Sequence, residues 1–106
     1  MVKVTFILNK TEYVGLIVEG HANFAECGKD IVCSAISSVV VGGLNGIKNI
    51  KSFDVSIEKG YVKCILKDNE TISEHDKVVL ETIRYQLLSI QEARSKNIQI
   101  REERIG

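Results

Sequence analysis

A histidine and two cysteines lie close together in the first third of this 106-residue chain, at His21, Cys27 and Cys33. A histidine that meets a cysteine can produce a sulfur nucleophile near neutral pH, because imidazole titrates there and can take the thiol proton. His21 is therefore a candidate general base and acid, and its alternative interpretation is an exposed loop residue. Cys33 is a candidate nucleophile, and its alternative interpretation is a small buried apolar residue.

The residues around Cys33 predict the start of a helix. Asp30 is a good N-cap, and the apolar spacing that follows it predicts a helix from 31 to 47, continuous through Gly42 and Gly43. Cys33 would lie in the first turn, where the helix dipole favours a thiolate. Ser37 would lie on the same helical face as Cys33 and could hydrogen-bond the substrate or the catalytic pair; its alternative interpretation is a hydrogen bond to the backbone of its own helix. Asp30 is interpreted first as a cap and second as a residue that orients His21, since a carboxylate beside Cys33 would disfavour the thiolate.

Metal binding is the sharpest competing interpretation of the same side chains. His21, Cys27 and Cys33 are the only local candidates, with five residues between each one and the next. Structural zinc sites have closer ligand pairs and a complete tetrahedral set. Gly42-Gly43 also lacks the pattern of a phosphate-binding loop. We therefore expect neither a metal nor another cofactor.

Composition limits the class of protein. Lys plus Arg and Asp plus Glu both number 14, and this balance counts against a dedicated nucleic-acid binder. No apolar run reaches the roughly 18 residues that cross a bilayer, and the N-terminal segment alternates as a strand rather than as a signal peptide. Three cysteines, an odd number, suit a reducing cytoplasm better than a disulfide framework. We expect a cytoplasmic protein with one domain over residues 1–106 and no membrane contact.

The elements around this stretch predict an α+β domain. Apolar alternation predicts strands at 2–8, 13–19, 53–58, 61–66 and 97–101. Ser73 and Asp76 resemble a capping box that opens a second helix reaching about Lys96. The order is therefore β-β-α-β-β-α-β, a mainly antiparallel sheet with two helices on one face.

Several other segments receive plainer interpretations. Residues 22–29 have no apolar period and predict a mobile loop. Lys59-Gly60 predicts a turn, and the charged end 101–104 is the only patch with a disorder-like composition. Cys64 is interpreted as a packed thiol and His75 as a surface residue.

The segments 20–22 and 28–37, Gly-His-Ala and Gly-Lys-Asp-Ile-Val-Cys-Ser-Ala-Ile-Ser, resemble the signature of the bacterial ribosomal-processing cysteine protease family, Prp. Length, element order and the long C-terminal helix extend the resemblance over essentially the whole chain. The resemblance implies that His21 is the catalytic histidine and Cys33 the nucleophile. It also implies supporting or substrate-binding roles in the motif for Asp30, Ser37, Gly20, Gly28 and Ser34.

The resemblance further implies a cytoplasmic, homodimeric endopeptidase. Its substrate would be the N-terminal extension of large-subunit ribosomal protein twenty-seven, with bulky, often aromatic residues just before the cut. Residues 22–29 would then close over the peptide as a lid. The alternative is a non-enzymatic ribosome-assembly or RNA-binding module. Neutral charge and only three Tyr, three Phe and no Trp argue against RNA as its main ligand.

Overall fold

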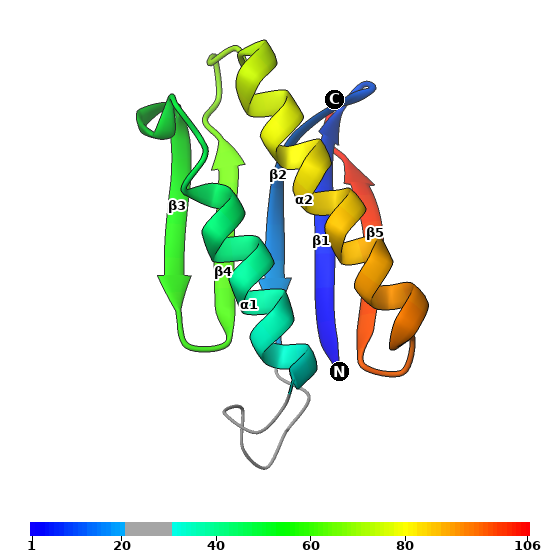
Figure 1. Cartoon of the computed structure of the whole chain (residues 1–106). Helices are drawn as coiled ribbons and strands as arrows, with labels where there is room; N and C mark the ends of the chain where they lie inside the picture. Colours follow the sequence, from blue (N-terminus) through cyan, green and yellow to red (C-terminus); the bar gives the residue numbers. More distant parts are fainter. Residues whose placement is uncertain (21–30) are drawn as a thin grey trace.

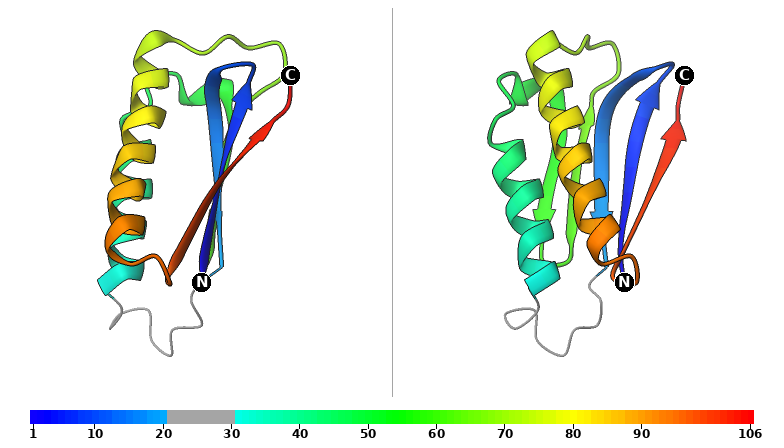
Figure 2. Two further views of the ribbon diagram at one scale, coloured as in Figure 1. Left: turned by 90° about the vertical axis from the view of Figure 1, so that its right-hand side faces the viewer. Right: turned by 45° about the vertical axis from the view of Figure 1, so that its right-hand side comes forward.

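The computed structural model describes residues 1–20 and 31–106. These residues form a five-stranded sheet with two α-helices packed on one face (Figures 1 and 2). The elements in chain order are β1 (Val2–Asn9), β2 (Glu12–Glu19), α1 (Ile31–Leu44), the 3-10 helix η2 (Ile50–Ser52), β3 (Phe53–Glu58), β4 (Tyr61–Leu66), α2 (Glu74–Ala93) and β5 (Ile98–Arg104). The predicted α+β class and element order are confirmed, with η2 as an addition.

The sheet has the strand order β3-β4-β2-β1-β5. Three neighbouring pairs are antiparallel, whereas β5 lies parallel to β1. Short turns join β1 to β2 and β3 to β4, and a short connection can only produce an antiparallel pair. The chain returns to β5 through α2, and this long crossover permits the parallel pairing.

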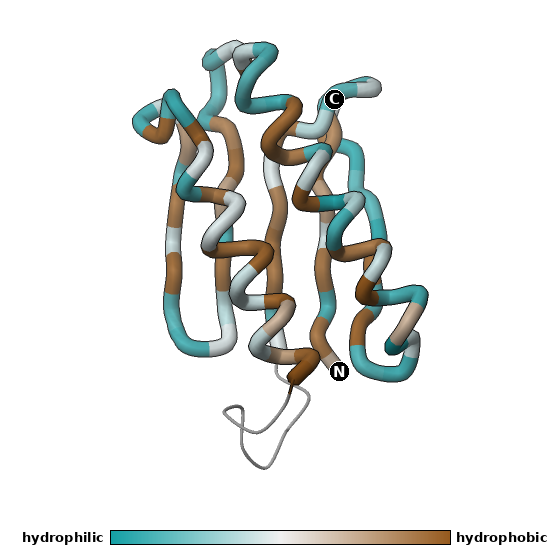
Figure 3. The backbone as a smooth tube through the Cα atoms, viewed as in Figure 1, coloured by the Kyte–Doolittle hydropathy of each residue, from teal (hydrophilic) through white to brown (hydrophobic). Residues whose placement is uncertain are grey.

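The core lies between the sheet and the helices. Residues that oppose one another across the strands, such as Phe6 and Leu16, or Leu16 and Cys64, are fully buried. In Figure 3 the apolar residues run along the strands beneath the two helices. The helices contribute their own buried stripes to the same cluster, namely Val32, Ile36, Val40, Leu44, Leu80, Ile83 and Leu87. Burial of these side chains holds α1 in place, since its many β-branched residues are poor helix formers alone.

The two helices approach closely at Gly43. A Cβ atom at this position would lie 2.5 Å from Cγ1 of Ile83 on α2, which leaves no room for a side chain. The neighbouring Gly42 faces open space, with no atom within 4 Å of its Cβ position. Gly43 therefore permits the close approach of α1 and α2, and α1 runs through both glycines without a break, as the sequence predicted.

Helix α1 ends at Leu44, so the predicted continuation to Ile47 is wrong. The N–H groups of Gly46 and Ile47 donate to the carbonyls of Gly43 and Leu44, which tightens the chain into 3-10-type turns. The next two N–H groups, of Lys48 and Asn49, donate to the Asp76 carboxylate at 2.8 and 3.2 Å. Ile47 is nevertheless buried, so its apolar side chain contributes to the core although the residue is not helical.

Helix α2 begins at the predicted cap. The Ser73 hydroxyl accepts a hydrogen bond from the Asp76 N–H at 3.2 Å. The reciprocal half of the capping box does not form, because the Asp76 carboxylate bonds the N–H groups of Lys48 and Asn49 instead. The helix ends at Ala93 rather than near Lys96.

The charged C-terminal end is ordered as strand, contrary to its disorder-like composition. Strand β5 continues to Arg104, three residues beyond the predicted end, because its pairing with β1 runs as far as Leu8 opposite Arg104. Side-chain contacts support it: the Tyr13 hydroxyl donates to Glu102, and Arg84 Nε lies 3.2 Å from the same carboxylate.

Candidate active site

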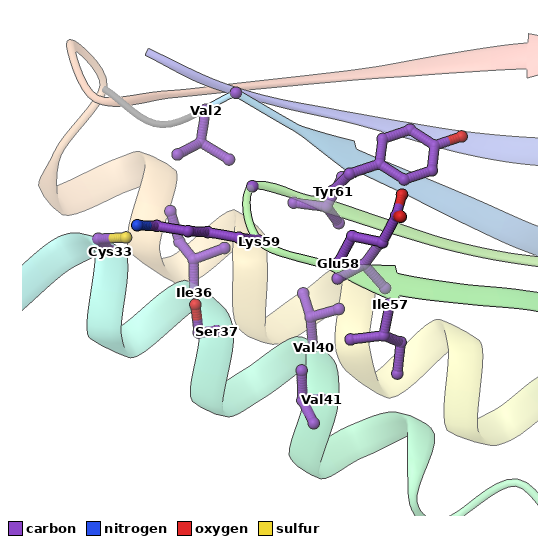
Figure 4. Close-up of a pocket in the computed structure, with 14 residues that line it drawn as sticks. Val2, Cys33, Ile36, Ser37, Val40, Val41, Ile57, Glu58, Lys59 and Tyr61 are labelled. Carbon is purple, nitrogen blue, oxygen red and sulfur yellow. The ribbon is translucent and has the colours of Figure 1, made fainter. Parts of the chain in front are cut away.

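Cys33 is the third residue of α1 and lies in its first turn, as the sequence predicted. Its side chain is 6% exposed and lines a groove between α1 and the β3–β4 hairpin (Figure 4). The N-terminal end of a helix carries the positive end of the helix dipole, which stabilises a thiolate in the first turn. This position is therefore suited to a nucleophilic sulfur.

The sulfur of Cys33 is in a disulfide in the structure, whereas the composition predicted reduced cysteines. A disulfide sulfur carries no thiolate, so nucleophilic chemistry at this position requires the reduced form. Each assay described below therefore contains a reductant.

The groove encloses about 250 Å³ and is mainly apolar. Its lining residues come from α1, from the adjoining ends of β3 and β4, and from β1 and β2. The apolar lining residues are Val2, Val18, Ile36, Val40, Val41, Ile57 and Val62. Polar side chains line it as well, namely Ser37, Glu58, Lys59 and Tyr61. A groove of this size and character accepts apolar side chains of an extended ligand.

Two further motif residues line the groove beside Cys33. Ser37, one helical turn later, is exposed and faces the groove, in agreement with the predicted shared face. Gly20 directly follows β2 and has a φ of 85°, a backbone conformation that residues with a side chain rarely adopt. Its N–H donates to the carbonyl of Gly60 at 3.1 Å, so the end of β2 is tied to the β3–β4 turn.

Other predicted site residues are not part of this arrangement. Ser34 is exposed and is not among the residues that line the groove. His21, Gly28 and Asp30 lie outside the described residues, as do the expected loop and lid at 22–29. Their predicted roles stay predictions.

The sequence interpretation missed the β3–β4 turn as part of the site. Lys59 was interpreted as a turn residue only, and Tyr61 as the start of a strand. The register of β2 on β4 pairs Glu19 with Tyr61, which brings this turn beside Gly20. Only long-range strand pairing carries that information, and no local sequence pattern reports it.

Cys64 is fully buried in β4, as the packed-thiol interpretation predicted. Burial, with a smaller contribution from the charge of Asp76, raises the pKa of the Cys64 thiol from 9.0 to about 11. The Cys64 thiol is therefore protonated near neutral pH and unsuited to nucleophilic attack.

His75 lies in the first turn of α2, where the sequence placed it on the surface. Its side chain is exposed, and Nε2 lies 2.9 Å from the carbonyl oxygen of Gly46. His75 therefore contacts the turn after α1 and takes no part in the groove.

Neither a cluster of metal-ligating side chains nor a membrane-spanning helix is present in residues 1–20 and 31–106. Within these ranges no group of three metal-ligating side chains is present, although His21 and Cys27 of the competing zinc interpretation lie outside them. No helix in these ranges is long and apolar enough to cross a membrane.

The chain is similar to proteins named ribosomal processing cysteine protease Prp. The ribosomal processing cysteine protease Prp of Staphylococcus aureus is 29% identical over 87 residues, which cover 80% of this chain and 82% of that protein. The Prp of Mycoplasma genitalium is 62% identical over a shorter stretch of 29 residues, which cover 27% of this chain and 29% of that protein.

Solved structures give the same result. The crystal structure of the S. aureus Prp protease with a covalently linked product peptide superposes with a TM-score of 0.82 at 27% identity, covering 97% of this chain and all of that one. The same protease with a substrate peptide gives a TM-score of 0.80 at 26% identity, with 97% of this chain and all of that one covered. The sequence pattern of the family described as cysteine protease Prp matches residues 1–99. The chain therefore belongs to the Prp family of cysteine proteases.

Proposed function

We propose that this cysteine protease removes the N-terminal extension of large-subunit ribosomal protein twenty-seven, with Cys33 as nucleophile and His21 as general base and acid. The observation that carries the proposal is the place of Cys33, in the first turn of α1 and on the wall of an apolar groove. Relatives named as ribosomal processing proteases support the substrate class.

The groove supports the binding of bulky residues before the cut. Ile36 and Val40 of α1 and Val18 of β2 line it with apolar surface, which favours apolar or aromatic side chains by removing them from water. A peptide whose acyl side lies in this groove brings its scissile carbonyl to Cys33. Ser37 is placed to hydrogen-bond that peptide.

The chemistry then follows from the groups at the site. His21, which directly follows Gly20 in the chain, takes the thiol proton, and the Cys33 thiolate attacks the scissile carbonyl carbon. Helix-start N–H groups stabilise the resulting oxyanion. As the C–N bond breaks, the His21 imidazolium gives its proton to the leaving amine, and a thioester remains. Water, deprotonated by His21, attacks the thioester; the C–S bond breaks, and the Cys33 thiol is restored with release of the carboxylate product.

The test is incubation of the reduced protein with the full-length ribosomal protein precursor, with the cut located by mass spectrometry. We expect one cut within the N-terminal extension, and no cut with Cys33→Ala or His21→Ala. Cys27→Ala is the matched cysteine control and should retain cleavage. Circular dichroism confirms that each variant is folded. Cleavage by folded Cys33→Ala, or an intact precursor with the reduced wild-type protein, would contradict the proposal.

The family resemblance also supports a cytoplasmic homodimer. Light scattering after gel filtration measures the molar mass directly, and we expect twice the 11.8 kDa of the chain. A monomer across the concentration range of the cleavage assay would contradict the dimer without affecting the catalytic assignment.

Membership of a cysteine protease family counts against the alternative of a non-enzymatic ribosome-assembly or RNA-binding module, and no described feature favours that alternative. The same cleavage assay separates the two, because a binding module leaves the precursor intact at every protein concentration.

A further inference from the structure

We infer that Lys59, in the turn between β3 and β4, is a positioning residue that favours the thiolate form of Cys33 by its charge. The inference rests on the proposed function, in which Cys33 is the nucleophile. It adds that a second segment of the chain, the β3–β4 turn, influences the pH range in which Cys33 reacts.

The turn that carries Lys59 is held at the Cys33 end of the groove. Glu58 pairs with Tyr61 across the turn, and Gly60 takes a φ of 78° that completes it. The Gly60 carbonyl also accepts the N–H of Gly20 at 3.1 Å. The backbone of Lys59 is therefore fixed on two sides, by its own hairpin and by the end of β2.

The side chain of Lys59 crosses the groove toward α1. Lys59 and Cys33 line the same groove, and Figure 4 shows the Lys59 amine pointing toward the Cys33 sulfur. None of the ion pairs within residues 1–20 and 31–106 involves Lys59. Its charge is thus not neutralised by a carboxylate of the described chain.

The other titratable groups that line the groove do not oppose this effect at Cys33. Glu58 and Tyr61 come from the same hairpin, and in Figure 4 the Glu58 carboxylate points away from Cys33. The groove-lining residues of α1 other than Cys33 are uncharged, as are those of β1 and β2. A cation beside a thiol favours its ionised form, and the first turn of a helix acts in the same direction. Lys59 therefore adds to the effect of the helix start.

The test is the pH dependence of Cys33 alkylation by iodoacetamide, in reductant and without peptide, with the modified residue located by mass spectrometry. On the acid side of the profile we expect Lys59→Met to lower the rate about three- to tenfold, and Lys59→Glu to lower it further. Lys59→Arg should remain near wild type. The difference between wild type and Lys59→Met should shrink in high salt, because salt screens the interaction of exposed charges.

Lys51→Met is the matched control, because Lys51 is an exposed lysine of η2 that does not line the groove. It should leave the profile unchanged. Equal profiles for wild type, Lys59→Met and Lys59→Glu would overturn the inference, as would an equal change in Lys51→Met. Lost cleavage with an unchanged alkylation profile would also overturn it, since Lys59 would then act on the peptide. Because alkylation needs no substrate, this result is separate from the fate of the proposed protease function.

Discussion

The backbone N–H of Gly20 donates a hydrogen bond to the carbonyl oxygen of Gly60, with an N···O distance of 3.1 Å. This bond joins the end of β2, directly before His21 in the chain, to the turn that carries Lys59. This hydrogen bond therefore holds the residue before the proposed base against the turn that lines the groove.

Gly20→Ala should weaken this junction. The φ of 85° is unfavourable for alanine, and the new Cβ would lie 2.9 Å from the carbonyl oxygen of Met1. We expect the free energy of unfolding in urea to fall by about 1–3 kcal/mol. The cleavage rate should also fall under conditions in which the variant is folded. A variant as stable and active as wild type would show that the junction has no such role.

Gly43→Ala and Gly42→Ala should have opposite effects on stability, although the two glycines are neighbours. At Gly43 the new methyl would overlap Cγ1 and Cδ1 of Ile83, at 2.5 and 2.7 Å, in a side chain that is 1% exposed. We expect a loss of about 1–3 kcal/mol from this overpacking. At Gly42 the methyl meets nothing within 4 Å, so the gain in helix propensity should stabilise the fold by about 0.5–1 kcal/mol.

A double-mutant cycle identifies the cause of the Gly43 penalty. Truncation by Ile83→Ala removes both atoms that the new methyl would meet, so Gly43→Ala should cost little in that background. An undiminished penalty would place the strain elsewhere than at the α1–α2 contact.

Local sequence patterns predicted the elements well because each element satisfies a local rule. Ser73 caps α2 because its hydroxyl accepts the N–H of Asp76 three residues later. The apolar residues of β1 predicted a strand, although its burial is continuous from Val4 to Leu8 rather than alternating. The predicted end of α1 at Ile47 was wrong, because Ile47 is buried but does not belong to a helix. The spacing of apolar residues therefore predicts which residues are buried more directly than it predicts where a helix ends.

In the candidate site, too, local contacts were predictable from the sequence and long-range contacts were not. Cys33 and Ser37 share a helical face, so their spacing alone placed them together. Lys59 reaches the site only through the pairing of β2 with β4, which brings the turn at Gly60 beside Gly20 although the two residues are 40 positions apart in the sequence. Such a partner is visible only once the register of the sheet is known.

Asp76 should contribute to stability through the connection after α1. Its buried carboxylate accepts the N–H groups of Lys48 and Asn49, which no longer have helical partners. Asp76→Ala leaves both donors without this acceptor, and we expect a loss of about 1–3 kcal/mol in urea denaturation. Glu74→Gln is the control, since the neighbouring Glu74 forms only an exposed ion pair with Lys77 and should change stability by less than about 0.5 kcal/mol. Equal effects of the two substitutions would show that helix-start charge matters rather than the buried bonds.

Cys64 should make the fold less stable at alkaline pH. Its pKa is raised to about 11 by burial, whereas an unfolded chain ionises this thiol from about pH 9. The folded state thus keeps a proton that the unfolded state loses, so stability is complete below about pH 9. Between about pH 9 and 11 it should fall by about 1.4 kcal/mol per pH unit from this group.

Urea titrations of wild type and Cys64→Ala across this range measure the contribution. The variant is less stable overall because it leaves a small cavity, yet its pH slope should be flatter than that of wild type. Parallel slopes would assign the alkaline loss to other groups.

Ser37 should act on the peptide and not on the fold. Its exposed hydroxyl lines the groove one turn after Cys33, so it can hydrogen-bond a bound peptide. Removal of one such bond costs about 0.5–1.5 kcal/mol, which predicts a roughly two- to tenfold fall in kcat/KM for Ser37→Ala. Ser38→Ala is the matched control, because Ser38 is also exposed on α1 but does not line the groove. Both variants should unfold at the same urea concentration as wild type. Since the two serines differ mainly in the helical face they occupy, an equal fall in kcat/KM for both would remove the groove as the peptide-binding surface.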